Sequence, residues 1–249
     1  MDASSPQDPA REFLDLWADI EKHLRHKYSL PGHIRTMGEI IAETRTRDAL
    51  VRRYEPALTA FRDLRNAIVH HPYRGDVPIA TPRPDTVDRL RRIHHELLHP
   101  AQIGRCLRAP VVSTAAPPDE PLRDALYEMA EHSYSQLPVY EDGRYLGLLT
   151  TNAVARWLAA QISDAGEVLV DQVLVREVLD FVEPTELVVH LARTVSVAAV
   201  IDGFRKEDPA GTLVAVIVSE LGLPTQKPLG VVVRDDLAYL LAQLPAVGL

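Results

Sequence analysis

The sequence predicts an α+β protein of two domains: an all-α, four-helix domain over residues 1–104 and an α/β domain over residues 105–249. Three observations predict this division. Before Gly104, apolar residues recur at intervals of three and four, which is typical of amphipathic helices. After Gly104, short apolar runs of strand length alternate with helical stretches. One strand–loop–helix pattern also occurs twice in this second part.

Apolar periodicity and proline positions define the elements of the first domain. Residues 72–84 contain four prolines and are expected to form a loop, and no segment of this domain predicts a strand. Pro56 lies inside the third helix and is expected to kink or split it. The expected helices cover residues 10–28, Met37–Thr44, Asp48–Val69 and Thr86–Leu98.

A cation and two titratable rings lie at the end of the third expected helix. Arg65 is followed by Asn66, and His70 and His71 come five and six positions after Arg65. Arginine can stabilise a charged phosphate, and histidine can accept or donate a proton. This pairing is a minimal set of groups for RNA cleavage without a metal ion.

These residues resemble the HEPN superfamily, whose signature is an arginine, usually followed by a polar residue such as Asn, then a histidine after four to six intervening residues. The resemblance covers roughly residues 10–100 and implies a metal-independent endoribonuclease in which two copies of the motif form one composite site in a homodimer. Arg65 and Asn66 match directly, while His70 and His71 both fit the spacing. Tyr73 matches the tyrosine that is modified in one toxin branch of the superfamily.

His95, Glu96 and His99 spell the H-E-x-x-H pattern of zinc metalloproteases. Pro100 ends the helix immediately after His99, and no following helix is available for a third zinc ligand. We therefore expect a chance match and predict no metal site.

The second part contains two copies of one element order, which we place at about residues 105–162 and 171–246. The repeated pattern begins at Gly147 in the first copy and at Gly230 in the second, 83 positions later. A strand end that opens a helix presents free backbone N–H groups, which suit a phosphate. The expected strands are Ala109–Thr114, Gln136–Tyr140 and Tyr145–Leu149, then Glu186–Leu191, Leu213–Val218 and Leu229–Val233; the closing helices are residues 152–161 and 235–245.

This succession resembles a tandem pair of CBS domains, also called a Bateman module, over residues 105–246. Such pairs typically bind adenine nucleotides or their relatives in clefts between the two repeats. The family pattern is a glycine, two apolar residues, a Thr or Ser that contacts phosphate, two variable residues and an Asp that binds the ribose hydroxyls.

Each copy keeps a different part of that pattern. The first copy keeps Thr150 but has Ala153 at the Asp position, with Asn152 beside it. The second keeps Asp236 but has Val233 at the hydroxyl position, with Arg234 beside it as a phosphate partner. The predicted ligand-binding residues are therefore Thr150, Asn152, Arg234 and Asp236.

The composition is that of a globular protein, with 46% hydrophobic and 25% charged residues. Cys106 is the only cysteine, so a reducing cytoplasm is the expected location. The start has no basic, apolar leader, and no apolar run approaches the roughly 18 residues of a membrane span. Residues 1–104 hold 16 Lys+Arg against 15 Asp+Glu, and the remainder 11 against 20, which supports a boundary between two modules.

The two resemblances together predict a cytoplasmic homodimer in which a nucleotide-sensing CBS pair controls a HEPN-like ribonuclease. An adenine nucleotide is expected as the regulatory ligand and RNA as the substrate, with no cofactor required and no membrane partner. The alternative is a non-enzymatic, ligand-responsive adaptor whose HEPN-like domain is inactive and serves dimerisation.

Overall fold

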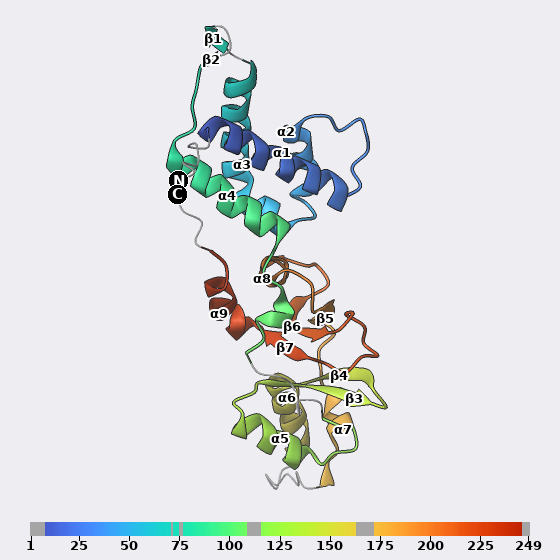
Figure 1. The fold of residues 1–249 in the computed structure, drawn as a ribbon. Helices are drawn as coiled ribbons and strands as arrows, with labels where there is room; N and C mark the ends of the chain where they lie inside the picture. The colour runs from blue at the N-terminus through green and yellow to red at the C-terminus, as the bar shows by residue number, and fades with distance from the viewer. Residues whose placement is uncertain (1–7, 71, 75–76, 109–115, 163–171, 246–249) are drawn as a thin grey trace. The chain divides into compact units, whose positions relative to one another are not determined.

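The structure is a computed structural model that describes residues 8–70, 72–74, 77–108, 116–162 and 172–245. The chain forms two compact units, one made of Met1–Ala101 with Pro245–Leu249 and one made of Gln102–Leu244. The helices and strands of both units are labelled in Figure 1.

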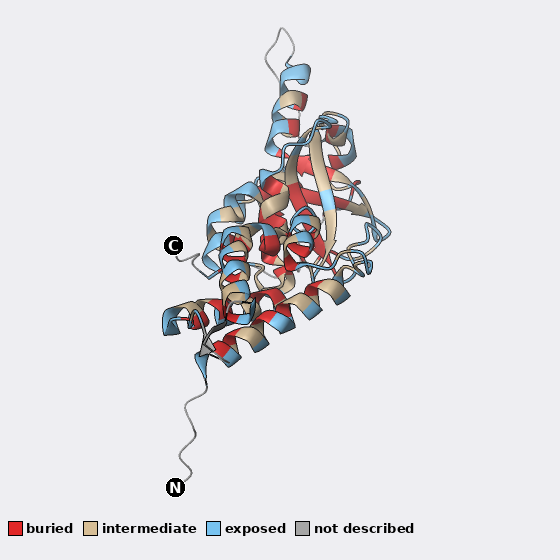
Figure 2. Ribbon diagram, turned by 90° about the horizontal axis from the view of Figure 1, so that it is seen from above, coloured by how far each residue is buried: buried red, intermediate tan, exposed pale blue. Residues whose placement is uncertain are grey.

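Four α-helices form the described core of the first unit. They are α1 (Pro9–Lys27), α2 (Met37–Thr44), α3 (Ala49–His70) and α4 (Pro84–Leu98). Helix α1 packs along α4, and α2 packs against α3. Each helix buries one face and exposes the other (Figure 2), as the apolar periodicity predicts. Between α1 and α3, the Phe13 and Phe61 rings meet edge to face with centroids 5.9 Å apart.

Asp48 joins α1 to the start of α3. Its Oδ1 accepts hydrogen bonds from the backbone N–H groups of Leu50 at 2.8 Å and Val51 at 3.2 Å, which caps α3. Its Oδ2 accepts from the Tyr28 hydroxyl at 2.6 Å and the Lys27 ammonium at 2.9 Å. Burial opposes the charged carboxylate, but the hydrogen bonds from Tyr28 and Lys27 outweigh it and lower the pKa of Asp48.

The structure departs from two expectations for the first unit. Helix α3 is one uninterrupted helix through Pro56, so it is not split there. Buried Tyr54 and Leu58 on either side of Pro56 anchor the helix to the core, which offsets the backbone hydrogen bond that proline cannot donate. The expected loop after α3 contains a short antiparallel pair, β1 (Pro72–Arg74) with β2 (Val77–Pro78), so this unit is not free of strands.

The first copy in the second unit is a hairpin between two helices. It contains α5 (Leu122–Glu131), β3 (Gln136–Glu141), β4 (Arg144–Thr150) and α6 (Thr151–Gln161). The turn has positive φ at Asp142 (49°) and Gly143 (78°), which is the geometry of a tight two-residue hairpin. The expected strand Ala109–Thr114 lies outside the described residues, but Ala116, which follows it, bridges parallel to Val139 of β3.

The second copy repeats this arrangement. Its elements are β5 (Glu186–Ala192), α8 (Val197–Arg205), β6 (Thr212–Ser219), β7 (Gly230–Val233), the 3-10 turn η3 (Arg234–Asp236) and α9 (Leu237–Ala242). The strand order is β5-β6-β7, with β5 parallel and β7 antiparallel to β6. The Ser196 hydroxyl caps α8 by accepting a hydrogen bond from Ala199 N at 3.2 Å. The last helix is shorter than expected because its first turn is the 3-10 turn.

Each copy is completed by the segment at the start of the other copy's residue range. The 3-10 turn η1 (Ile103–Arg105) bonds to the second copy, where Ile103 N donates to Val195 O at 2.9 Å. The short helix α7 (Val175–Leu179) belongs to the core of the first copy, where Val175 N donates to Glu120 O at 3.0 Å. Helix α7 has no counterpart among the predicted elements.

Two glycines leave space for the segments that pack on the opposite copy, an arrangement that we call the exchange of segments. A Cβ atom at Gly147 would lie 3.2 Å from the Leu179 side chain, and one at Gly230 would lie 2.7 Å from the Leu107 side chain. The glycine that opens each repeated pattern therefore provides space for a leucine from the segment leading into the other copy. The two copies fold as one intertwined unit.

Candidate functional site

A cleft of about 390 Å³ opens in the second unit beside the end of β7. Its lining comes from three segments: residues 106–108 at the start of the first copy, residues 132–136 from the end of α5 to the start of β3, and parts of residues 231–240. The cleft therefore combines both copies with the exchanged segment, and it contains the repeated pattern of the second copy.

Asp236 is the charged centre of this cleft. Its Oδ2 accepts a hydrogen bond from Val233 N at 3.0 Å, and its Oδ1 lies 3.6 Å from Nη1 of Arg108. The Asp236 side chain is 20% exposed, so it is positioned by the turn yet remains open to a ligand. The Arg108 guanidinium lies over the Tyr239 ring, 4.7 Å from its centroid.

Apolar and aromatic groups form the rest of the wall. Val231, Val232 and Leu240 contribute apolar surface, and Val232 and Leu240 are buried. On the side of the first copy, the His132 and Tyr134 rings lie 5.3 Å apart with 32° between their planes. The arrangement offers a largely apolar cleft flanked by the carboxylates of Asp235 and Asp236 and by the guanidinium of Arg108.

Of the four predicted ligand-binding residues, Asp236 alone lines this cleft. Arg234 is exposed and does not line it; Arg108, from outside the repeated pattern, provides the cation instead. Sequence reasoning missed Arg108, His132 and Tyr239. No spacing rule links them to Asp236, because the exchange of segments between the copies brings them together.

In the first copy the polar groups are occupied by the fold itself. Thr150 is buried, and its hydroxyl accepts from Ala153 N at 3.0 Å to cap α6. Asn152 is exposed on the first turn of that helix. Neither residue lines the cleft described above.

Arg156 of the first copy occupies the position that corresponds to Tyr239, 83 residues earlier. Its guanidinium bonds to Glu186 Oε1 at 2.9 Å, to Glu183 Oε1 at 3.1 Å and to Phe181 O at 3.1 Å. The first copy therefore has an arginine engaged in ion pairs at the position where the second copy has an aromatic ring.

In the first unit, the structure brings the predicted nuclease residues together. Arg65 Nη1 lies 2.9 Å from His70 Nε2 and 3.4 Å from Asn66 Oδ1 in the last turns of α3. His70 and Asn66 are exposed and Arg65 is partly exposed. His71 lies outside the described residues, as does the side chain of Tyr73.

The H-E-x-x-H match has a structural role. Glu96 is buried, and its Oε2 accepts from the Tyr54 hydroxyl at 2.6 Å. Burial and this carboxylate raise the pKa of Tyr54 to about 12. Within the described part of the chain, His95 and His99 do not belong to any group of three metal-ligating atoms within 4.8 Å of one another.

Comparison with known proteins identifies a class of domain. The CBS domain family matches residues 104–160, so this stretch of the chain is a CBS domain. It contains η1, α5, β3, β4 and most of α6, with the Thr150 copy of the repeated pattern. A search of curated proteins gives no match.

Several solved CBS structures resemble the chain. The CBS domain of a membrane protein from Sphaerobacter thermophilus is 23% identical with a TM-score of 0.43, covering 64% of this chain and 98% of that one. CBSX2 in complex with AMP is 17% identical (TM-score 0.39; 57% and 97% covered). CbpB in complex with c-di-AMP is 11% identical (TM-score 0.43; 63% and 93% covered). In the described part of this chain, no helix combines the length and apolarity that crossing a membrane requires.

Proposed function

We propose that the second unit is a pair of CBS-type repeats and that its cleft binds an adenine nucleotide as a regulatory ligand. The observation that carries this proposal is the convergence of Asp236, Arg108 and Tyr239 on one cleft. The CBS domain at residues 104–160 supports it, because the resemblance to CBS pairs implies nucleotide binding between repeats.

Each part of a nucleotide has a matching group in the cleft. The Asp236 carboxylate can accept hydrogen bonds from two ribose hydroxyls, as the family pattern implies. Arg108 can donate to a phosphate. The apolar wall formed by Val231, Val232 and Leu240 can hold a planar base. Binding requires Arg108 to leave Asp236, and their 3.6 Å separation and the 59% exposure of Arg108 make that pair weak.

The experiment is a thermal unfolding series on the full chain with AMP, ADP, ATP, NAD and cyclic dinucleotides. A ligand at a hundred times its dissociation constant stabilises the folded state by about 2.7 kcal/mol. Asp236→Ala is expected to abolish the shift. Asp142→Asn removes one carboxylate in the exposed β3–β4 turn and is expected to behave as wild type. If no nucleotide at millimolar concentration raises the melting temperature, the second unit is better described as a structural scaffold.

We propose a second function for the first unit, a HEPN-like, metal-independent endoribonuclease, on the strength of the 2.9 Å contact between Arg65 and His70. While Arg65 donates to Nε2, that nitrogen cannot accept a substrate proton. A phosphate bound by Arg65 would draw the guanidinium away and release the imidazole as a base. One Arg–His pair offers few catalytic groups, so the proposal includes a homodimer with two pairs in one site.

Cleavage of single-stranded RNA in EDTA tests this second function. Arg65→Ala, and either His70→Ala or His71→Ala, are each expected to lower the rate about 10²–10⁴-fold, the typical contribution of one acid–base group. The products should carry 2′,3′-cyclic phosphates, because the 2′-hydroxyl is the nucleophile. If wild type and Arg65→Ala are equally inert with and without nucleotides, the non-enzymatic adaptor is the better description.

A further inference from the structure

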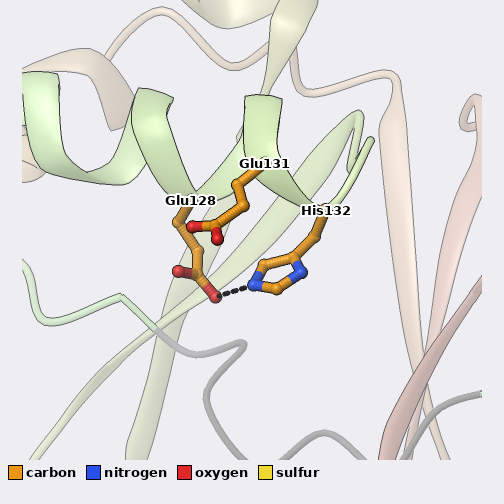
Figure 3. A group of neighbouring side chains, drawn as sticks. All are labelled: Glu128, Glu131 and His132. Carbon is orange, nitrogen blue, oxygen red and sulfur yellow. Dashed lines mark ion pairs between the residues drawn. The ribbon is translucent and has the colours of Figure 1, made fainter.

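The last turn of α5 and the residue that follows it carry three side chains of the types that bind metal ions: Glu128, Glu131 and His132. One ligand atom from each lies within 4.8 Å of the other two (Figure 3). His132 Nε2 is 3.4 Å from Glu128 Oε1. Spacings of three and four residues place all three on one face of the helix.

We propose that these three residues bind a divalent cation such as Mn²⁺ or Zn²⁺, and that the bound cation also binds the phosphates of a nucleotide in the adjacent cleft. This inference rests on the proposed nucleotide function of the cleft and extends it. It makes a metal complex of a nucleoside diphosphate or triphosphate the preferred ligand.

The ligand set favours such a cation. Two carboxylates and one imidazole combine hard oxygen ligands with a nitrogen ligand, which suits Mn²⁺ or Zn²⁺ better than Ca²⁺, which prefers oxygen alone. Three protein ligands also leave coordination positions open for water or for a phosphate oxygen. The three side chains come from one helical turn, so the ligands are already close together without movement of the backbone.

The position of His132 points to a ligand independently of the carboxylates. His132 is part of the cleft wall, beside Tyr134 and in the same cleft as Arg108 and Asp236. A cation bound to its imidazole would therefore lie at the rim of the cavity in which the nucleotide is proposed to bind. The metal ligands and the cleft are separate observations that meet at this one residue.

Electrostatics favour a bound cation where the phosphates of a nucleotide lie near the end of α5. Glu128 and Glu131 lie at the carboxyl end of α5, where the helix dipole is also negative. Arg108 is the cation in the cleft, and it is paired with Asp236. Without a metal ion, phosphate groups near His132 are repelled by the two glutamates; a divalent cation bound there reverses the sign of that interaction.

The coupling between the two ligands must be reciprocal: if the cation tightens nucleotide binding by some factor, the nucleotide tightens cation binding by the same factor. We expect a factor in the range of about 5–150, typical of coupled sites. Adenosine has no phosphate, so its affinity should not respond to the cation.

The test uses the full-length protein after EDTA treatment and dialysis. Binding of Mn²⁺ alone is measured by electron paramagnetic resonance, and binding of adenosine, AMP and ATP is measured by calorimetry with and without Mn²⁺. Wild type should bind Mn²⁺, and ATP should bind more tightly in its presence. Glu131→Gln should weaken Mn²⁺ binding about tenfold or more, because it loses a charged ligand. It should leave metal-free ATP binding unchanged or slightly tighter, because it also removes a repelling charge.

Asp142→Asn is the matched control, since it neutralises one carboxylate on the same unit in the exposed β3–β4 turn. Failure of wild type to bind Mn²⁺, or equal binding by wild type, Glu131→Gln and His132→Gln, overturns the metal site. Mn²⁺ binding with no change in ATP affinity overturns the bridging role. If the nucleotide still binds in EDTA, the proposed function of the cleft stands whatever the result for the metal ion. Failure of the metal site is therefore distinguishable from failure of the nucleotide site.

Discussion

In the first copy of the repeated pattern, the Thr150 side chain accepts a hydrogen bond from the backbone N–H of Ala153 at 3.0 Å. In the second copy the direction is reversed, and the Asp236 side chain accepts from the backbone N–H of Val233 at 3.0 Å. Thr150 corresponds to Val233, and Ala153 corresponds to Asp236. Each copy therefore closes its turn with the polar side chain that it has kept. The backbone of the turn can therefore be maintained by either residue.

The surroundings determine which copy can bind a ligand. The hydroxyl of Thr150 is buried and used by the cap, whereas the second oxygen of Asp236 faces the cleft and Arg108. At the next helical turn, Arg156 of the first copy is held by Glu183 and Glu186, while Tyr239 of the second copy lines the cleft. The comparison favours the second copy as the proposed binding site, because it has kept the carboxylate and has an aromatic ring in the cleft where the first copy has an arginine held by ion pairs.

Among the substitutions that test the difference between the two copies, the largest expected effect is the loss of stability when Arg156 is replaced. Arg156→Ala leaves Glu186, whose side chain is only 9% exposed, without its 2.9 Å partner. Because this substitution leaves the largely buried Glu186 carboxylate unpaired, we expect it to lower the free energy of unfolding more than the loss of an exposed ion pair does. Chemical denaturation measures this value.

Arg176 provides the control for that prediction. It pairs with Asp119 and Glu141 on the exposed surface of the same unit. Arg176→Ala should change the free energy of unfolding very little, as is usual for ion pairs on the surface. Equal costs at Arg156 and Arg176 would contradict a structural role for the Arg156 ion pairs.

The two glycines give a matched pair of substitutions. Gly230→Ala places a Cβ 2.7 Å from the Leu107 side chain, whereas Gly147→Ala places one 3.2 Å from Leu179. Overpacking of this kind costs about 1–3 kcal/mol, and we expect Gly230→Ala to lie in that range and Gly147→Ala below it. Melting temperatures of the two variants test the order, and the reverse order would show that Leu107 yields more easily than Leu179.

A histidine between the two copies predicts a dependence on pH. Both ring nitrogens of His190 in β5 are buried and make no hydrogen bond to the described residues, and the ring packs edge to face on Tyr145 of β4 at 4.8 Å. Tyr145 in turn packs on Tyr140 of β3, and Glu186 precedes His190 in β5. Burial penalises the imidazolium and lowers the pKa of His190 below its ordinary value.

The lowered pKa means that the folded protein binds fewer protons at His190 than the unfolded chain does. The stabilising contribution is thus complete above the unfolded pKa of about 6.5 and is lost as the pH falls below it. His190→Gln removes this titration. The free energy of unfolding of wild type should fall more between about pH 7.5 and pH 5.5 than that of the variant. Parallel pH profiles would show that His190 protonates without disturbing the contact with Tyr145.

Much of the architecture could be predicted from the sequence because it depends on local signals. Helix α2 was expected over the residues it occupies, and the hairpin turn at Asp142 and Gly143 follows from residues that tolerate positive φ. The exchange of η1 and α7 between the copies could not be predicted, because it depends on Leu107 and Leu179 meeting glycines that are distant in sequence. The same limit explains the site: Asp236 lies in a recognisable pattern, whereas Arg108 and His132 reach the cleft only through tertiary packing.

The smallest expected effect comes from restoring the missing hydroxyl of the second copy. Val233→Thr replaces the partly buried side chain at the position of Thr150 with one of similar shape that carries a hydroxyl. The turn is already closed by Asp236, so the new hydroxyl is not needed as a cap and is free to donate to a phosphate. One additional hydrogen bond contributes about 0.5–1.5 kcal/mol, so AMP affinity should rise by no more than roughly tenfold while adenosine affinity stays unchanged. A loss of AMP affinity in calorimetry would mean that the hydroxyl instead competes with Asp236 for the turn, as Thr150 caps the first copy.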